Sequence, residues 1–156
     1  MALEEKLVNR LIELDYHISF AESCTGGLCC GNLVNVTNAS KVLDVSFTTY
    51  ANEAKIEFLG VSPDTILKYG VVSEEVAYEM AQGVANAAKS QVGVGVTGVA
   101  GPGGGTAKKP VGMVCFGFSI NGTVKTYTMQ FGEIGRNQVR KSSVEFVFET
   151  LLKLLK

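Results

Sequence analysis

The sequence predicts an α/β protein of one domain, residues 1–156, in which helices pack on a mixed sheet. Apolar segments of strand length alternate along the chain with segments of helical periodicity. The last two strand segments are joined by Asn121-Gly122, the strongest short signal for a β-hairpin. Strands that alternate with helices favour parallel neighbours, whereas a hairpin adds antiparallel ones, so a mixed sheet is expected.

The first half of the chain begins with an amphipathic helix, because Leu3, Leu7, Val8 and Leu11 share one helical face. Farther along, apolar and polar side chains alternate over residues 44–50, as they do in a strand. The elements predicted here are a helix over 2–14, a strand over 17–22, a helix over 28–36, a loop or short turn over 38–43, a strand over 44–50 and a helix over 52–59 closed by Gly60.

The second half contains two clear helix starts. Pro63 suits the first helical position, and Ser73 followed by two glutamates is a typical N-terminus. Residues 91–97 are uncharged and rich in valine and glycine, as in a buried central strand. The elements predicted here are a short helix from Ser62, a longer helix from Ser73, a strand over 91–97, a glycine-rich loop over 98–110, strands over 111–120 and 123–131, and a helix from about Asn137.

The charge balance argues against a nucleic-acid or membrane partner. Fourteen basic and fifteen acidic residues leave the chain nearly neutral, so the expected partner is a small molecule. The longest nearly uncharged apolar run, 111–120, is half a membrane span, and the N-terminus carries Glu4 and Glu5 where a signal peptide is basic. We expect a soluble protein that is not exported.

The cysteines indicate neither a disulfide framework nor a metal site. Three of the four lie within seven residues, at Cys24, Cys29 and Cys30, and no C-x-x-C pair occurs. His17 is the single histidine. A reduced, cytoplasmic setting without a metal or other cofactor fits this usage best.

The segment AESCTGG, residues 21–27, places two possible nucleophiles between a predicted strand and a predicted helix. Backbone N–H groups without partners converge at a helix start, which could lower the pKa of the Cys24 thiol. No histidine is placed to assist Cys24 or Ser23, so a serine nucleophile would need a lysine as its base. The alternative is structural: a helix cap by Ser or Thr, with glycines that allow tight packing.

Tyr50 and Lys55 are candidate partners for Ser23. They follow a predicted strand, and open α/β sheets place ligands at the ends of their strands. The alternative is that both side chains belong to a solvated rim. His17 is interpreted as a strand-edge residue without a catalytic role, because nothing near it in the sequence is seen to orient it.

Glycines and arginines supply the remaining candidates. The spacing Gly93-x-Gly95-x-x-Gly98 matches the dinucleotide-binding pattern, but it lies inside a strand and no helix follows, so a Rossmann interpretation is rejected. The loop 98–110 is either a ligand-binding loop or a plain surface loop. Arg136 and Arg140 share a helical face and could hold a phosphate, or else pair with nearby glutamates.

Five segments together resemble the C-terminal domain family of the competence- and damage-inducible protein CinA. The segments are AESCTGG at 21–27, TYANEAK at 49–55, GVVSEEV at 70–76, GVTGVAGPGGGT at 95–106 with KPVG at 109–112, and the pair Arg136 and Arg140. The resemblance implies a three-layer α/β/α sandwich with a mixed, mostly parallel sheet, and it suggests a homo-oligomer such as a dimer. Gly103 and Met113 differ from the commonest family pattern, which has Asp and Thr at these positions.

The resemblance also implies an activity, because stand-alone members of the family are nicotinamide-nucleotide amidases. These enzymes hydrolyse nicotinamide mononucleotide to nicotinate mononucleotide and ammonia in pyridine-nucleotide recycling. The implied catalytic residues are Ser23, Tyr50 and Lys55. The implied substrate-binding residues are Thr25, Gly26, Gly27, Thr97, Gly98, Gly101, Gly104, Arg136 and Arg140.

Two other functions are weighed against this one. A non-catalytic nucleotide-binding or regulatory module would fit the two departures from the family pattern and the lack of a Ser-His or Cys-His pair. A metal-dependent hydrolase ranks third.

Overall fold

The computed structural model describes all 156 residues, whose five strands form one mixed sheet in the order β2-β1-β3-β4-β5. β1 pairs in parallel with β2 and β3, whereas β4 runs antiparallel to both β3 and β5. The strands are β1 (Ile18–Glu22), β2 (Phe47–Thr48), β3 (Val92–Gly98), β4 (Met113–Ile120) and β5 (Thr123–Gln130). The predicted mixed sheet is confirmed, and β4 alone runs against the other strands.

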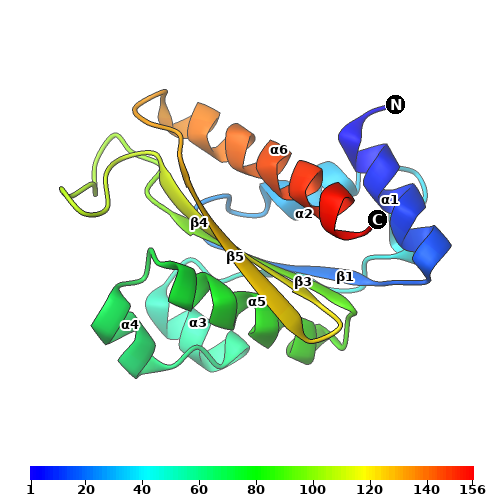
Figure 1. The fold of residues 1–156 in the computed structure, drawn as a ribbon, viewed down its shortest axis with the longest axis horizontal. Helices are drawn as coiled ribbons and strands as arrows, with labels where there is room; N and C mark the ends of the chain where they lie inside the picture. The colour runs from blue at the N-terminus through cyan, green and yellow to red at the C-terminus, as the bar shows by residue number, and fades with distance from the viewer.

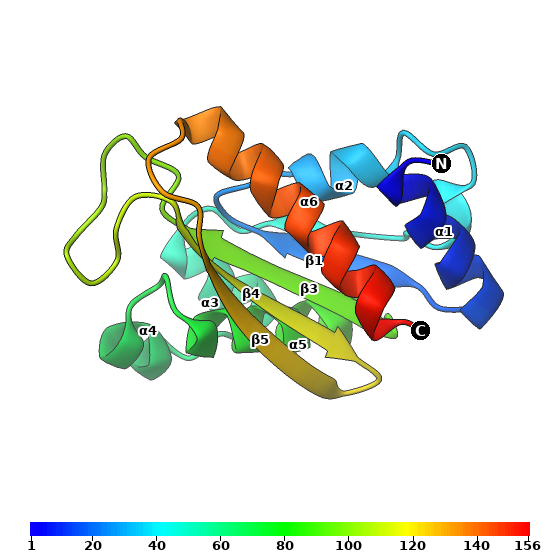
Figure 2. The ribbon, with the colours of Figure 1, turned by 45° about the horizontal axis from the view of Figure 1, so that its top comes forward.

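Helices cover both faces of the sheet, so the fold is a three-layer α/β/α sandwich (Figure 1). One face carries α1 (Leu3–Leu14), α2 (Leu28–Leu33) and α6 (Arg136–Leu154). The other carries α3 (Asn52–Leu59), α4 (Pro63–Tyr69) and α5 (Glu74–Ala88). Figure 2 shows α6 lying along the first face, with the loop after β3 extending beyond the sheet near the start of α6.

The core is divided by the sheet into two unequal parts. The larger cluster lies under α1, α2 and α6 and includes Leu7, Leu11, Phe116 and Phe148. The smaller lies under α5, where Val76, Met80 and Val84 form a fully buried stripe. Burial of these side chains, at about 25 cal/mol per Å² of apolar area, is the main force that holds the layers together.

The glycines of the central strands allow α5 to lie unusually close to the sheet. A Cβ atom on Gly93 would lie 2.4 Å from the Ala81 carbonyl oxygen, and one on Gly95 would lie 2.6 Å from that of Ala77. Such distances are far inside van der Waals contact. The close packing of α5 therefore explains the first two glycines of the spacing Gly93-x-Gly95-x-x-Gly98, and no dinucleotide-binding role is needed.

Two predicted elements are shorter in the structure. The strand expected over 44–50 is reduced to Phe47–Thr48, because the Ser46 hydroxyl accepts the Phe20 N–H and so replaces part of the ladder. The helix expected over 28–36 ends at Leu33, before a run of residues with low helix propensity. The helix predicted over 52–59 and the Asn121-Gly122 hairpin are confirmed, with both turn residues at positive φ.

None of the helices combines the length and the hydrophobicity that a membrane-spanning segment requires.

Candidate active site

Ser23 lies immediately beyond the carboxyl end of β1, where the neighbouring parallel strands also end. Its N–H donates to the Val96 carbonyl of β3 at 3.1 Å, and the Thr49 N–H, just beyond β2, donates to the Glu22 carbonyl at 2.9 Å. Because β1, β2 and β3 run in the same direction, the segments that follow them meet at one edge of the sheet. The sheet therefore brings three separate segments around the Ser23 hydroxyl.

Lys55 is buried against Ser23, with only 1% of its surface exposed. Its Nζ lies 3.1 Å from the Ser23 Oγ and also donates to the carbonyls of Thr49, at 2.6 Å, and Tyr50, at 3.2 Å. No carboxylate forms an ion pair with it. Burial without a counterion lowers the pKa of the Lys55 ammonium from 10.5 to about 8. A neutral amine is thus accessible near neutral pH beside a serine hydroxyl.

Burial makes the Cys24 thiol less reactive, in contrast to its effect on the Lys55 amine. Its side chain is 7% exposed, and burial raises the pKa of its thiol to about 12. The possibility that a helix start lowers this pKa is therefore wrong, because desolvation of the thiolate outweighs any favourable dipole. Of the two candidate nucleophiles in the segment, only Ser23 has a base in contact with it.

The N-terminus of α2 is already occupied by a side chain. The buried Glu22 carboxylate accepts the N–H groups of Cys29, at 2.8 Å, and Cys30, at 3.0 Å. This carboxylate takes the place that a bound anion would otherwise have at a helix start. Nothing in the local spacing identified Glu22 beforehand, although a glutamate before a helix start is a usable signal for such a cap.

The turn between β1 and α2 keeps some of its N–H groups free. The Gly26 N–H donates to the Ser23 carbonyl at 3.0 Å, so it is not available to a ligand. The N–H groups of Cys24, Thr25 and Gly27 have no acceptor in the chain. Of the free N–H donors predicted beside Ser23, these three remain available.

A cavity of about 260 Å³ opens beside Ser23. Its wall is formed mainly by three segments: the turn of residues 23–27, the loop after β3 and the start of α6. We call residues 23–27 the nucleophile turn because they contain the two candidate nucleophiles, Ser23 and Cys24. It is lined by Ser23, Cys24, Tyr50, Val72, Gly98, Val99, Ala100, Gly101, Gly103, Gly104 and Arg136. Of the residues expected to bind substrate, Gly98, Gly101, Gly104 and Arg136 line this cavity, whereas Thr25, Gly26, Gly27, Thr97 and Arg140 do not.

Tyr50 and Arg136 meet at the mouth of the cavity. Arg136 donates from Nη2 to the Tyr50 hydroxyl at 3.1 Å and from Nη1 to the Gly101 carbonyl at 2.8 Å. Tyr50 is 62% exposed, and only its backbone carbonyl contacts Lys55. Tyr50 is therefore placed to contact a ligand together with Arg136, and its hydroxyl is not hydrogen-bonded to Ser23 or Lys55.

Two predicted ligand contacts are replaced by internal hydrogen bonds. The Thr97 hydroxyl is buried and donates to the Val71 carbonyl at 3.0 Å. The Arg140 guanidinium donates to the carbonyls of Cys24 and Thr25, so it does not join Arg136 in a shared anion site. Neither arginine forms an ion pair with Glu133 or Glu145, which also excludes the alternative expected from the sequence.

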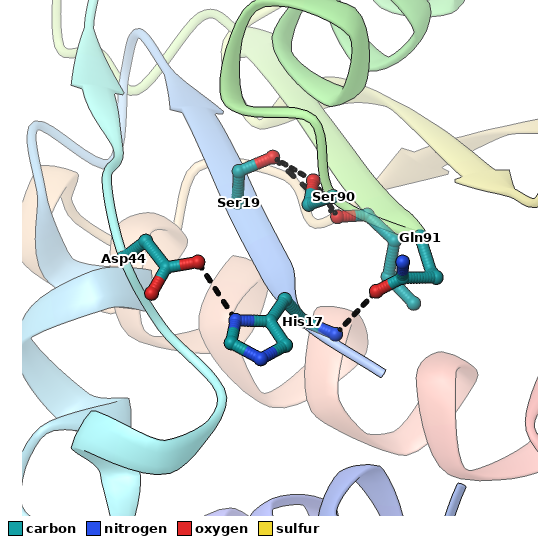
Figure 3. A network of polar contacts seen from close by, with 6 residues as sticks. His17, Ser19, Asp44, Ser90 and Gln91 are labelled. Carbon is teal, nitrogen blue, oxygen red and sulfur yellow. Dashed lines mark hydrogen bonds and ion pairs between the residues drawn. The ribbon is translucent and has the colours of Figure 1, made fainter. Parts of the chain in front are cut away.

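His17 lies at the opposite end of β1, before Ile18, and a carboxylate orients it (Figure 3). Its ring Nδ1 is 2.7 Å from Asp44 Oδ2, and its backbone N–H donates to Gln91 Oε1 at 2.7 Å. The interpretation that nothing orients His17 is thus wrong, because Asp44 is brought to it by the Ile18–Leu43 bridge. The length of β1 separates this pair from Ser23, so it takes no part in the candidate site.

No group of three or more His, Cys, Asp or Glu side chains is placed to hold a metal ion. The site combines a serine hydroxyl and a buried amine beside a small cavity with one arginine at its mouth.

Comparison with known proteins shows which family the chain resembles. A family model described as the CinA C-terminal domain matches residues 1–155. A putative competence-damage inducible protein of Alkaliphilus oremlandii is 45% identical over 151 residues, which are 97% of this chain and 36% of that protein. A CinA-like protein of Kosmotoga olearia is 44% identical over 154 residues, 99% of this chain and 37% of that protein. The chain thus spans little more than a third of these relatives.

Solved structures agree with the fold over the whole chain. The competence/damage inducible protein CihA from Agrobacterium tumefaciens superposes with a TM-score of 0.91 at 40% identity, covering 100% of this chain and 98% of that one. A competence or damage-inducible protein from Enterobacter asburiae superposes with a TM-score of 0.95 at 34% identity, covering 99% and 96%.

Proposed function

The chain belongs to the CinA C-terminal domain family, and we propose that it is an amidohydrolase that converts nicotinamide mononucleotide to nicotinate mononucleotide and ammonia. The observation that carries this proposal is the contact of 3.1 Å between Lys55 Nζ and Ser23 Oγ, made by a lysine that is buried without a counterion. The choice of substrate rests on the resemblance to the family's stand-alone amidases.

In the first step, the Ser23 Oγ attacks the carboxamide carbon while neutral Lys55 takes the hydroxyl proton. The carbonyl oxygen becomes an oxyanion, which accepts hydrogen bonds from free N–H groups of the nucleophile turn. The amide C–N bond then breaks, and the Lys55 ammonium returns its proton to the departing nitrogen, which leaves as ammonia. Ser23 is left as an ester of the nicotinate group.

In the second step, water attacks the ester carbon and gives a proton to Lys55. The C–O bond to Ser23 breaks, Lys55 returns the proton to the Ser23 oxygen, and nicotinate mononucleotide is released. The carbonyls of Thr49 and Tyr50 hold Nζ in reach of Oγ in both steps. A lysine of ordinary pKa would be protonated and could not start this cycle, so burial is what supports its role as base.

The phosphate of the substrate is assigned to the start of α6. This helix has no side-chain cap and no acidic residue in its first turn, and Arg136 is its first residue. Its backbone hydrogen bonds begin with the Val139 N–H to the Gly135 carbonyl, which leaves the preceding N–H groups free. An uncapped helix N-terminus beside an arginine favours an anion, and this one lies at the cavity mouth.

The test is an ammonia-release assay with purified protein and nicotinamide mononucleotide. Ser23→Ala should lower kcat/KM by roughly 10⁴-fold or more, as loss of a serine nucleophile does in other hydrolases. Cys24→Ala is the matched control beside it and should retain activity within tenfold. Wild type that releases no ammonia, or Ser23→Ala that releases it at the same rate, would contradict the proposal.

A nucleotide-binding module without catalysis is the second candidate, and one observation favours it. Gly103 lines the cavity at a position where the common family pattern has aspartate, so a polar contact of that pattern is missing from the wall. This function predicts that the protein binds nicotinamide mononucleotide in calorimetry without releasing ammonia. The same protein preparation therefore separates the two candidates.

A further inference from the structure

Arg140 makes the longest-range polar contact with the nucleophile turn. It lies in the second turn of α6, and its Nε donates to the Cys24 carbonyl at 3.0 Å while its Nη2 donates to the Thr25 carbonyl at 3.2 Å. Its Nη1 donates to Asn137 Oδ1 at 3.3 Å. Each of the three nitrogens of the guanidinium thus has an acceptor inside the protein.

The turn is shaped to receive this side chain. Gly26 has a φ of 58°, and a Cβ atom at this position would lie 3.3 Å from Arg140 Nη2. The left-handed conformation and the close approach both favour glycine here. The glycine that was predicted to contact substrate instead gives the guanidinium access to the two carbonyls.

The contact with Cys24 determines the direction of the next N–H group. In a trans peptide unit the carbonyl and the following N–H point in opposite directions. Because Arg140 holds the Cys24 carbonyl on one side of the turn, the Thr25 N–H is directed to the other side. Thr25 is fully buried, and its N–H has no acceptor in the chain.

A buried N–H without an acceptor is uncommon and destabilising by about 1–3 kcal/mol. The Cys24 N–H also lacks an acceptor, and Cys24, unlike the fully buried Thr25, lines the cavity directly after Ser23. A partner for this N–H is expected in the functional state. The group that develops beside Ser23 during acyl transfer and needs such a donor is the oxyanion.

We infer that Arg140 is a positioning residue, which holds the Cys24–Thr25 peptide unit and so fixes the turn in which the Cys24 N–H donates to the oxyanion formed when Ser23 attacks. This inference rests on the proposed role of Ser23 as nucleophile. It assigns Arg136 alone, with the start of α6, to the substrate phosphate. It also explains why two arginines four residues apart on one helix have different tasks.

The first experiment separates positioning from phosphate binding by steady-state kinetics with nicotinamide mononucleotide. Arg140→Ala should lower kcat roughly 100-fold, the typical effect of losing one oxyanion donor, with KM changed less than twofold. Arg140→Lys should be similarly slow, because a lysine lacks the planar guanidinium that places Nε and Nη2 on separate carbonyls. Added guanidinium ion at millimolar concentration should restore activity several-fold to the alanine variant only. Arg136→Ala is the matched control and should raise KM.

A raised KM with unchanged kcat in Arg140→Ala would overturn the inference, since that pattern belongs to a phosphate contact. Unchanged kcat and KM would overturn it as well. If Arg140→Ala does not fold, as judged by circular dichroism, Asn137→Ala replaces it. That variant frees Nη1 only and should lower kcat by a few-fold.

The second experiment does not depend on the natural substrate. A fluorophosphonate labels activated serines through an adduct that resembles the tetrahedral intermediate, so its rate at Ser23 reports on the oxyanion donors. Labelling measured by mass spectrometry should be at least tenfold slower in Arg140→Ala than in wild type. If wild type labels but releases no ammonia, the proposed substrate is wrong and the inference stands. Equal labelling of both proteins, or none in wild type, contradicts the inference.

Discussion

The two ends of β1 carry two different polar pairs, and the comparison shows what makes a residue a base. At the amino end, His17 and Asp44 form a contact of 2.7 Å in which both side chains are substantially exposed. At the carboxyl end, Lys55 contacts Ser23 and is 1% exposed. No nucleophile contacts the side chains of the His17–Asp44 pair, whereas Lys55 contacts the Ser23 hydroxyl.

Environment, more than residue type, separates the two ends. A lysine in water is protonated at neutral pH and is a poor base. Burial without a counterion brings the pKa of Lys55 to about 8, so about a tenth of the molecules hold a neutral amine at pH 7. The exposed His17–Asp44 contact at the other end is surrounded by solvent and contributes little.

The largest expected effect comes from removing the buried amine. Lys55→Met should lower kcat/KM for nicotinamide mononucleotide by about 10³-fold or more, because Ser23 then has no base. The measurement is ammonia release, and His17→Gln is the control at the other end of β1, expected to retain full activity. Comparable losses of kcat/KM in both variants would contradict the assignment of the base to Lys55 at the carboxyl end of β1.

The same substitution tests the burial of the charge through stability. The pKa of Lys55 is lower in the folded than in the unfolded chain, so the unfolded chain binds more protons between pH 8 and 10.5. The unfolding free energy of wild type should therefore rise across this window, by up to about 3 kcal/mol from this group. Denaturant titrations should show that rise reduced in Lys55→Met, and equal pH dependence would contradict it.

Glu22 provides a structural test at the Ser23 end. Glu22→Gln replaces one accepting oxygen by an NH₂ group that faces a backbone N–H of α2, so we expect a loss of about 2 kcal/mol in unfolding free energy. Urea titration measures it. Glu13→Gln, on the exposed face of α1, is the control and should change stability by less than about 0.5 kcal/mol.

The pH dependence of kcat/KM tests whether Lys55 is the base. Because neutral Lys55 is the proposed base, kcat/KM should rise about tenfold from pH 6 to 7 and level off above pH 8. Initial rates of ammonia release across pH 6–9.5 provide the measurement. The profile of His17→Gln should coincide with that of wild type. A rate that falls over this range would exclude a lysine base.

The smallest effect is expected at the amino end of β1. Asp44→Asn removes the carboxylate from His17, and an exposed pair of this kind stabilises a protein by about 0–1 kcal/mol. Unfolding free energy should fall by no more than that at pH 6, with activity unchanged. A loss of several kcal/mol would show that this pair has a structural importance that its exposure does not indicate.

Local pattern was sufficient for most elements of the fold. The helix over 52–59 and the Asn121-Gly122 hairpin are found as predicted, because caps, turn residues and periodicity act over a few residues. The strand over 44–50 was overestimated, since alternation does not reveal that the Ser46 side chain accepts a ladder N–H. Edge pairing depends on neighbours that the pattern does not contain.

The sequence by itself determined where the strands end, and so which segments, including the nucleophile turn before α2, lie beyond them. The tertiary structure decided what each polar group there contacts: Lys55 is buried against Ser23, Glu22 caps α2, and Arg140 holds carbonyls 116 and 115 residues away. The physical reason is that burial and long-range hydrogen bonds arise only when distant segments pack together. A pKa, a free N–H or an occupied guanidinium therefore belongs to the folded chain and cannot be assigned from spacing.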